Sequence, residues 1–561
     1  MAYQQPLGSA SQLGFNPRAE TPGMASPRPS AHLSHSEQDR FLDHQNAGSP
    51  YYQQHAYAQR SYFDSQAHTA AAASYPEKGA KKGLFARKPW LAALLAILVI
   101  AIIAGAVAGG MFASHSKKDD NSKANTSSRP KTSGSPTASG SSTAAAPTPT
   151  ITPLARYNWR DPNTVAYGVN IGNWLVIERW LDEDWFTSLC ADCEDEWNLS
   201  AHLGGNAVPT LQKHYNDFLQ ESDIDTMKSL GMNMLRVTIG YWAVIDTPGE
   251  PFVNAGQLNQ LRKLMEWCHA RGIYIIISMH GLPGSQSGDQ STGVKKDWSV
   301  GGTSWYTSKN QARSDQVITA FANWITQQQP YASVIAAVLP VNEPKQTDAD
   351  GSLHGNWQEL IQDFYLRSYK TLSSIGMVMS IHPGYWQGQD PSAWDSFIKS
   401  NNMDPNLVLW ETHPYPGYFP IQTDEDHIMN TVCNLGEIHN SISVPVYFGE
   451  FSTLSGVTDN GFLKRYWNTQ LAAYSKSAGS AFWTWKANNA TNPVRALSSN
   501  QMSRYDFQFL KDQGIASQPA AGQTFQQYVN GLSHNQCNNQ RRRKRQFEHR
   551  DAGKARLLPS H

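Results

Sequence analysis

Eight apolar runs recur between residues 154 and 537, and most are separated by stretches long enough for a helix. In order, the runs are AYGVNIGNWL, MLRVTIG, IYIIISMH, VIAAVLPVNEP, MVMSIHPGYW, LVLWETHPY, VYFGEFS and AFWTWK. The segments ESDIDTMKSLG and GQLNQLRKLMEWCHARG precede the second and third runs and end in the glycine that commonly follows a helix. Alternating strands and helices predict an α/β fold with a parallel sheet, and eight strands predict a closed (β/α)8 TIM barrel. The alternative is an open doubly wound sheet, although no glycine-rich phosphate loop follows the first run.

Three segments of different composition precede this predicted barrel domain. Residues 1–88 are rich in Ser, Gln, Ala, Pro and His and poor in aliphatic residues, so they cannot bury enough apolar surface to fold, and we expect a disordered tail. Residues 89–113 contain an uncharged stretch, Trp90 to Ala113, that is long enough to cross a hydrocarbon core of about 30 Å as a helix. Residues 114–153 are rich in Ser, Thr and Pro and predict an extended stalk.

The predicted transmembrane helix lies far from residue 1 and exceeds the usual apolar core of a signal peptide, which leaves a cleaved signal as the alternative. Lysine and arginine residues are nearly balanced on its two sides, so charge indicates the orientation only weakly. Potential N-glycosylation sites occur at Asn125, Asn198 and Asn489, all after the predicted helix. Their placement favours a single-pass type II protein with a cytoplasmic amino-terminal tail.

Charge and cysteine content narrow the function classes. Lysine plus arginine and aspartate plus glutamate are equal at 46 each, so no global charge indicates nucleic acid as a partner. Five cysteines are too few for a disulfide scaffold and leave at least one unpaired within the chain. Cys190 and Cys193 form a single CxxC motif with no second pair at zinc spacing, which favours a local disulfide over a metal site. Cys268 shares an apolar helical face and is expected to be a buried free thiol.

Polar residues stand in or at the ends of most of the predicted strands, where a barrel of this type carries its reactive groups. In strand order they are Arg236, His280, Asn342 with Glu343, His413 with Tyr415, Glu450, and Trp483. Taken singly, each fits a structural role: an ion pair, a loop residue or a core side chain. Two glutamates that end two apolar strands are harder to explain in that way. Burying a carboxylate beside a core costs free energy unless the group is paired with a cation or has a function.

Several motifs in this part of the chain resemble those of the exo-β-1,3-glucanases of glycoside hydrolase family 5. VNEP (341–344), FGEFS (448–452) and HGLPGSQ (280–286) carry the resemblance, and GVNIGNWLVIERW, LRV, THPY and FWTWK follow in the same order. The resemblance implies that Glu343 is the acid/base and Glu450 the nucleophile, with no metal or cofactor. It also implies a disulfide between Cys433 and Cys537. The residues implied to surround or contact the sugar are Glu178, Arg236, His280, Asn342, His413, Tyr415 and Trp483.

The resulting expectation is a monomeric, retaining β-glucosidase that releases glucose from the ends of β-1,3-linked glucan during cell-wall remodelling. With the predicted membrane helix, it would sit in the plasma membrane with its catalytic domain facing the cell wall. The same two carboxyl groups could also cleave β-1,6-glucan or transfer a glycosyl group to another sugar. From a different class come a non-catalytic carbohydrate-binding barrel, and an interaction protein in which the barrel is a scaffold.

The chain departs from the family pattern at several positions. In one loop the family commonly has an aromatic and an acidic residue, whereas this chain has SGDQS at 287–291. Ser278 and Met279 stand where the family usually has Asp-Leu, and Glu411 stands where Asp is usual. These departures leave linkage preference and exo or endo cutting open. Residues 538–561 form a basic tail with five consecutive cationic residues, which is typical of a solvated segment, with polyanion binding or proteolytic processing as alternatives.

Overall fold

The computed structural model describes residues 151–296, 302–349, 352–384, 391–418, 421–488, 499–532 and 537. The predicted tail, membrane helix and basic tail lie outside these residues, as do Asn125, Asn489 and all of the stalk except its last three residues. Within the described ranges, no helix has the length and apolar character needed to cross a bilayer. The predictions for the outlying segments therefore stay predictions.

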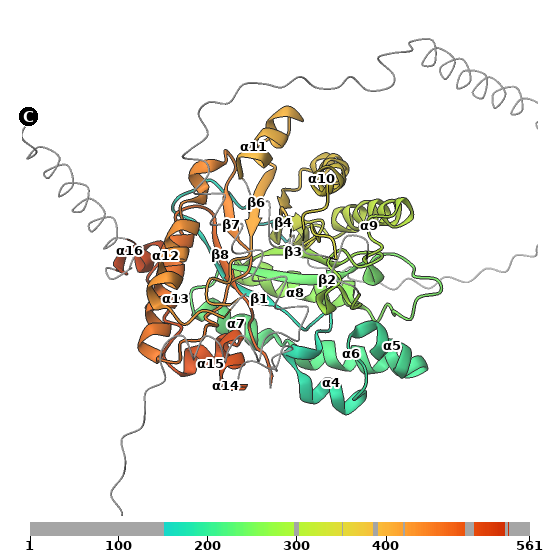
Figure 1. The fold of residues 1–561 in the computed structure, drawn as a ribbon, viewed down its shortest axis with the longest axis horizontal. Coiled ribbons are helices and arrows are strands. Elements are labelled where there is room, and N and C mark those ends of the chain that lie inside the picture. The colour runs from blue at the N-terminus through green and yellow to red at the C-terminus, as the bar shows by residue number, and fades with distance from the viewer. Residues whose placement is uncertain are drawn as a thin grey trace, which may run out of the picture.

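The described residues form eight strands that close into a barrel in sequence order, each parallel to its neighbours (Figure 1). The closed barrel is confirmed, and the open doubly wound alternative is wrong because β1 pairs with β8. The strands are β1 (Ala166–Ile171), β2 (Met234–Gly240), β3 (Tyr274–Gly281), β4 (Ile335–Leu339), β5 (Met379–Ile381), β6 (Val408–Thr412), β7 (Val446–Phe448) and β8 (Gly479–Phe482).

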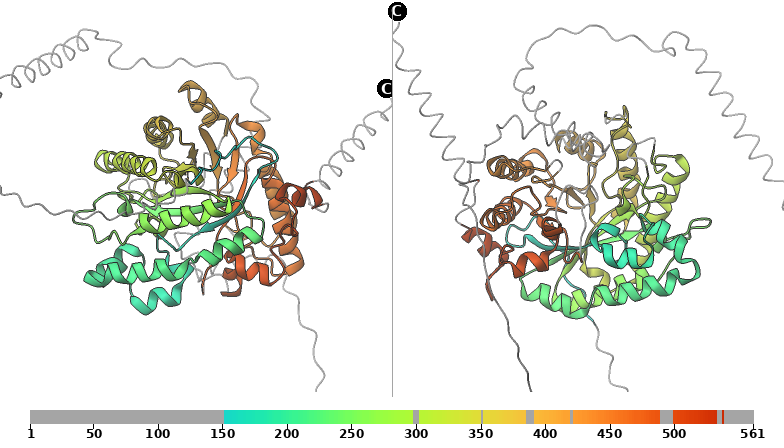
Figure 2. Two further views of the ribbon diagram at one scale, coloured as in Figure 1. Left: turned by 180° about the vertical axis from the view of Figure 1, so that it is seen from behind. Right: turned by 60° about the horizontal axis from the view of Figure 1, so that its bottom comes forward.

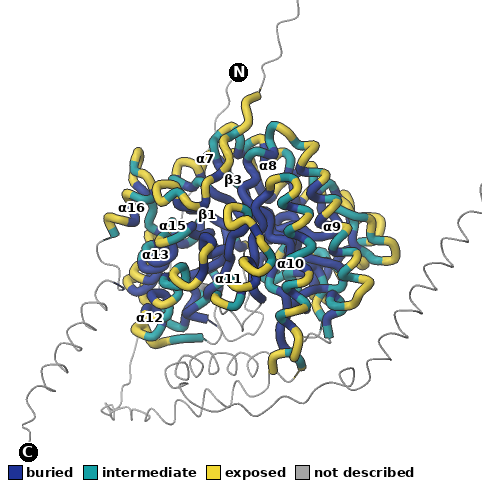
Figure 3. Tube along the Cα trace, turned by 90° about the horizontal axis from the view of Figure 1, so that it is seen from above, coloured by how far each residue is buried: buried dark blue, intermediate teal, exposed yellow. Residues whose placement is uncertain are grey.

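Helices surround the strands and bury their outer faces, as the three ribbon views show (Figures 1 and 2). A strand covered on both faces reads as a continuous apolar run, which explains the pattern seen in the sequence. Buried residues gather along β1, β3 and the neighbouring interior, while exposed residues lie on the outer surface (Figure 3). The helices are α4 (Glu183–Leu189), α5 (Glu196–Leu203), α6 (Ala207–Phe218), α7 (Glu221–Ser229), α8 (Gln257–Arg271), α9 (Ser308–Gln327), α10 (Trp357–Ser374), α11 (Pro391–Ser400), α12 (Glu425–Leu435), α13 (Asn460–Tyr474), α14 (Ser499–Met502), α15 (Phe507–Asp512) and α16 (Phe525–Gly531).

Local sequence signals set the ends of these helices. In α4, α5, α9, α12, α13, α15 and α16, an Asp or Thr at the N-cap accepts a hydrogen bond from a backbone N–H of the first turn. Helix α8 ends at Gly272, which adopts the left-handed conformation with φ 62° and so stops the helix without a Cβ clash. Its buried face carries Leu261, Leu264, Met265 and Cys268, as the periodicity predicts.

Two disulfides tie segments outside the barrel strands. Cys190 bonds to Cys193 between α4 and α5, which agrees with the local disulfide favoured by the sequence. Cys433 in α12 bonds to Cys537, the pairing that the family resemblance implied. Cys268 is a free, buried thiol, and burial raises its pKa well above the usual value.

The first and last strands approach each other and β2 so closely that glycine is required. A Cβ atom on Gly168 in β1 would lie 1.6 Å from the carbonyl oxygen of Met234, and one on Gly479 in β8 would lie 2.0 Å from that of Ala166. Since Cβ atoms cannot approach carbonyl oxygens this closely, any side chain here would open the seam of the barrel.

A buried carboxyl group holds the loop that follows β1. Glu196, at the start of α5, has no exposed surface, and its Oε2 accepts a hydrogen bond from the backbone N–H of Ile177 at 2.8 Å. Burial raises the pKa of Glu196 to about 8. The folded chain therefore binds this proton more tightly than the unfolded chain does, and the stability it contributes is present below about pH 4.5 and is lost as pH rises toward 8.

We predict that Glu196→Gln makes the fold less sensitive to pH, because a neutral amide can still accept from Ile177 without ionising. Relative to wild type, the variant should gain up to about 4 kcal/mol in the free energy of unfolding between pH 5 and pH 8. Chemical denaturation at the two pH values measures this difference. Glu194→Gln, at an exposed neighbour, is the matched control and should show no such gain; equal pH dependence of the Glu196 variant and wild type would contradict the prediction.

Candidate active site

The predicted site residues come together at the carboxyl ends of the strands. Arg236 and His280 lie within β2 and β3, while His413 and Trp483 directly follow β6 and β8. Glu450 lies two residues beyond β7, and the remaining members, Glu178, Asn342, Glu343 and Tyr415, stand on the loops that follow β1, β4 and β6. Several strands end earlier than the apolar runs suggested, so the carboxyl groups stand on short loops above the barrel.

Arg236 occupies the centre of this group and is completely buried. Its neighbour on β1 in the paired register is Asn170, whose side-chain oxygen accepts a hydrogen bond from Arg236. A guanidinium group has five N–H donors, and each can be matched here to an acceptor. The acceptors are Glu411 Oε1 for Nε at 2.7 Å, Glu450 Oε1 and Asn170 Oδ1 for Nη1 at 2.7 and 3.0 Å, and Asn342 Oδ1 and Ser278 Oγ for Nη2 at 2.7 and 3.2 Å.

Both oxygens of Glu450 accept hydrogen bonds. Arg236 donates to Oε1 at 2.7 Å, and the hydroxyl group of Tyr415 donates to Oε2 at 2.8 Å. Burial raises the pKa of Glu450, while Arg236 and Tyr415 lower it. The two donors favour the ionised carboxylate, although burial is the larger effect.

Glu343 is bound to fewer donors and lies in a strained backbone conformation. Its φ of 45° is in the left-handed region, which is uncommon for a residue other than glycine and is typical of functional sites. Its Oε1 lies 2.8 Å from Nδ1 of His413, and its side chain keeps 16% of its surface exposed. Burial, followed by the negative charge of Glu450, raises the pKa of Glu343 well above its usual range. Because Arg236 and Tyr415 bind Glu450 directly, the surroundings of the two carboxyl groups favour the proton on Glu343.

His413 lies among three carboxyl groups, one in β6 and two on the loops that follow β4 and β7. Besides the contact with Glu343, its Nε2 is 3.1 Å from Glu411 Oε1, and its Nδ1 is 3.7 Å from Glu450 Oε1. Burial and the charge of Arg236 lower the pKa of His413 well below its usual value, so the ring is neutral.

Asn342 and His280 are oriented by Arg236 and Ser278. Arg236 donates to the amide oxygen of Asn342, which directs the amide nitrogen toward His280 Nε2 at 3.5 Å. The hydroxyl group of Ser278 lies 2.9 Å from His280 Nδ1 and also accepts from Arg236. Ser278, at a position where the resembled family usually has Asp, therefore still connects the histidine to the arginine.

Trp483 and Glu178 border the same group of side chains. The ring of Trp483 is parallel to that of His280, with centroids 5.5 Å apart. Oε2 of the buried Glu178 accepts from the indole N–H of Trp180 at 3.0 Å, whereas Oε1 has no hydrogen-bond partner among the described residues. Burial raises the pKa of Glu178 well above its usual range. One oxygen of this carboxyl group is thus available to a ligand hydroxyl group.

The loop that follows β3 brings Asp289 near the carboxyl groups. Its Oδ1 accepts from the backbone N–H of Ser291 at 2.9 Å, and its charge raises the pKa values of Glu343 and Glu178. Burial lowers the pKa of Lys345 to about 8, while Asp289 raises it. Asp289 thus supplies an acidic side chain in the segment where the resembled family commonly has an aromatic and an acidic residue, and residues 287–291 include no aromatic one.

No site residue was predicted in β5 or directly after it, yet Ser380 in this strand and His382 directly after it each contact the site. The hydroxyl group of Ser380 donates to Glu411 Oε2 at 2.6 Å, and the buried ring of His382 packs against His413 with centroids 4.2 Å apart. Polar residues inside the apolar run MVMSIHPGYW were the available signal, as was Asn170 within the first run.

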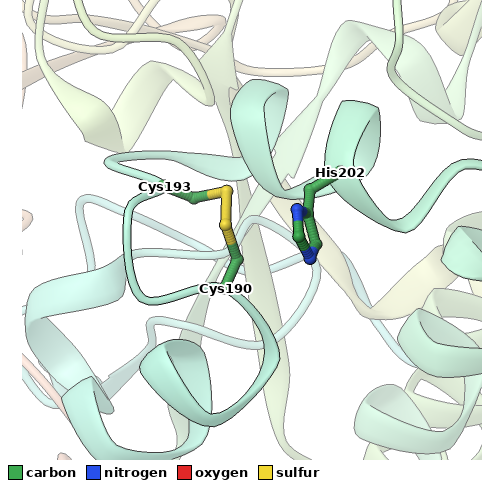
Figure 4. A group of neighbouring side chains, drawn as sticks. All are labelled: Cys190, Cys193 and His202. Carbon is green, nitrogen blue, oxygen red and sulfur yellow. A yellow bond between two sulfur atoms is a disulfide. The ribbon is translucent and has the colours of Figure 1, made fainter.

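Two groups of side chains bring potential metal-binding atoms within 4.8 Å of one another among the described residues. In the first, Cys190 and Cys193 already form a disulfide beside His202 (Figure 4), so their thiolates are not available. The second comprises Glu343, His382 and His413, of which Glu343 and His413 are in hydrogen-bond contact at 2.8 Å. Glu343 and His413 are therefore close enough to share a proton, whereas neither ring nitrogen of His382 has a hydrogen-bond partner among the described residues. Asn198, a predicted glycosylation site, is exposed on α5.

Comparison with known proteins agrees with this arrangement. The family model described as "Cellulase (glycosyl hydrolase family 5)" matches residues 199–491, more than half of the chain. Glucan 1,3-beta-glucosidase 1 of Schizosaccharomyces pombe is 30% identical over 396 residues, which cover 64% of this chain and 90% of that protein. The probable glucan 1,3-beta-glucosidase A of Aspergillus fumigatus is 28% identical, covering 60% of this chain and 86% of that protein.

Among solved structures, rutinosidase from Aspergillus niger superposes with a TM-score of 0.56 at 22% identity, covering 65% of this chain and all of that one. This likeness concerns the fold. The family match and the curated relatives, together with two carboxyl groups at the ends of β4 and β7, show that the chain belongs to glycoside hydrolase family 5 and is a glycosidase.

Proposed function

We propose that this glycosidase is a retaining β-glucosidase that hydrolyses β-1,3-linked glucan and releases glucose from chain ends. The observation that carries the retaining mechanism is the closeness of Glu343 and Glu450. Both contact Nδ1 of His413, at 2.8 and 3.7 Å, so their Oε1 atoms are separated by no more than 6.5 Å, the sum of 2.8 and 3.7 Å. Retaining enzymes place the two carboxyl groups about 5–5.5 Å apart, and inverting enzymes about 6.5–9.5 Å.

The two carboxyl groups divide the reaction by their hydrogen bonds. Glu450 attacks the anomeric carbon, since Arg236 and Tyr415 stabilise its ionised form and aim its oxygens. Glu343 donates its proton to the departing glycosidic oxygen, because burial and the charge of Glu450 keep it protonated. With the glycosyl group on Glu450, the ionised Glu343 takes a proton from water, which then releases the sugar.

Neighbouring groups fit a single glucose residue. The amide nitrogen of Asn342, held by Arg236, can donate to the sugar 2-hydroxyl group, a contact that strengthens in the transition state. Glu178 Oε1 can accept from another hydroxyl group, and Trp483 offers an apolar ring. These contacts position the sugar without a metal ion, since the two carboxyl groups supply the proton and the nucleophile.

The substrate and location rest on other observations. The curated relatives from S. pombe and A. fumigatus are named glucan 1,3-beta-glucosidases, which supports β-1,3-glucan as the substrate. The predicted membrane helix at residues 89–113 and the glycosylation motifs after it support a single-pass type II protein in the plasma membrane. The catalytic domain would then face the cell wall and act in glucan remodelling.

The defining experiment measures sugar release from laminarin by the purified full chain in mild detergent. We expect glucose as the first product, with retained β configuration by proton NMR, and losses of at least about 10³-fold in Glu343→Gln and Glu450→Gln. Faster release from β-1,6-glucan, or longer oligosaccharides as products, would instead indicate the alternative linkage or glycosyl transfer. No release from either glucan, with unchanged binding in all three proteins, would contradict the enzyme and leave a carbohydrate-binding barrel.

A second prediction concerns Tyr415→Phe, which removes the donor to Glu450 Oε2 and leaves the ring in place. Because this hydrogen bond lowers the pKa of Glu450, the acidic limb of the kcat/KM profile should move to higher pH. We expect kcat/KM to fall by about 10- to 100-fold, as for the loss of one hydrogen bond to a charged group. An unchanged acidic limb would show that Tyr415 does not control the ionisation of Glu450.

A further inference from the structure

Glu411 is completely buried beneath the catalytic carboxyl groups and contacts three polar side chains. Its Oε1 accepts from Arg236 Nε at 2.7 Å and lies 3.1 Å from His413 Nε2, while its Oε2 accepts from Ser380 at 2.6 Å. Space for the carboxylate comes from Gly449, where a Cβ atom would lie 2.1 Å from Oε1. These contacts fix the position of the Glu411 side chain behind His413.

The contacts of His413 specify which nitrogen carries its proton. The buried ring is neutral, so it has one donor and one acceptor. Nε2 faces Glu411 Oε1, which can only accept when ionised, and Arg236 Nη2 at 3.3 Å. Both protons of Nη2 already have acceptors, Asn342 Oδ1 and Ser278 Oγ, so this group has none left for Nε2.

The proton of His413 therefore belongs on Nε2, where it is donated to Glu411. That leaves a lone pair on Nδ1, which faces Glu343 Oε1 at 2.8 Å. An ionised Glu343 would place two acceptors against each other, whereas a protonated Glu343 donates to Nδ1. The tautomer of the ring and the protonation of Glu343 are linked through these two contacts.

We propose that Glu411 is a positioning residue that fixes the Nε2–H tautomer of His413 and thereby keeps the catalytic proton on Glu343 in the free enzyme. Resting on the proposed acid role of Glu343, this assignment adds a residue that never touches the sugar. Other titratable or charged groups around the ring are His382 directly after β5, His280 of β3, Arg236 of β2 and Glu450 after β7. In the described structure, Glu411 is placed to accept the Nε2 proton at 3.1 Å.

The first test reads the tautomer directly. The full chain is labelled with nitrogen-15 histidine, and the side-chain resonances of His413 are assigned by their loss in His413→Gln. We expect the proton on Nε2 in the wild-type protein. A proton on Nδ1, or on both nitrogens, would overturn the proposal even if the enzyme cleaves glucan as proposed.

The second test separates acid catalysis from structure by the leaving group. Glu411→Gln keeps an acceptor but removes the charge that holds the Nε2 proton. In kcat/KM, which reports the step in which the leaving group departs, laminarin, whose leaving sugar needs a proton, should lose about 10²-fold more than 2,4-dinitrophenyl β-glucoside, whose leaving group departs unprotonated. Any loss that acts through Arg236 and Glu450 is common to the two substrates. In the matched control, Ser380→Ala removes the donor to Oε2 and should affect both substrates alike.

Equal losses for the two substrates in Glu411→Gln, accompanied by a lower Tm, would assign Glu411 a purely structural role and overturn the proposal. An inactive wild type toward both substrates would instead contradict the proposed function. The two failures are therefore distinguishable. Should Glu411→Gln not fold, the nitrogen-15 measurement on the wild-type chain still decides the question.

Discussion

The buried guanidinium group of Arg236 is the interaction on which the rest of the site depends. A cation with no exposed surface is tolerated inside a barrel only when its charge and all of its donors are matched. Glu411 and Glu450 supply the two carboxylates, so the charge that the fold must neutralise also orients Glu450, the proposed nucleophile. The stability of the barrel and the arrangement of the site thus depend on the same ion-pair network. A lysine has three donors and no planar guanidinium group, so it could not replace Arg236.

Two carboxyl groups of the same kind acquire different roles because their surroundings differ. Burial raises the pKa values of both, but Arg236 and Tyr415 bind Glu450, whereas Glu343 faces a neutral imidazole and the charge of Glu450. The asymmetry is thus built from neighbours on other strands. The neutral ring of His413 links the carboxyl groups, since it can accept a hydrogen bond from Glu343 at Nδ1 while it donates one to Glu411 from Nε2.

Much of the fold was predictable because strands covered on both faces leave apolar runs, and most of the site because strand ends carry polar residues. The roles of Ser380 and Glu411 could not be predicted from the sequence, since they depend on side-chain length and on the room that neighbouring strands leave. The carboxylate of Glu411 fits only where β7 presents Gly449, which becomes apparent when β6 and β7 are paired. Likewise, the left-handed backbone of Glu343 has no signal in a run that reads as an ordinary strand end.

The pairing of β1 with β8, where Gly479 allows the two backbones to approach closely, also limits when the barrel can close. Strand β1 is synthesised more than 300 residues before the partner that completes its pairing, so one of its edges stays open throughout synthesis of the barrel. Contacts of such long sequence separation form slowly, and open strand edges promote association with other chains. Barrel closure therefore cannot precede the synthesis of β8, and until then this edge of β1 lacks the partner that pairs with it in the folded barrel.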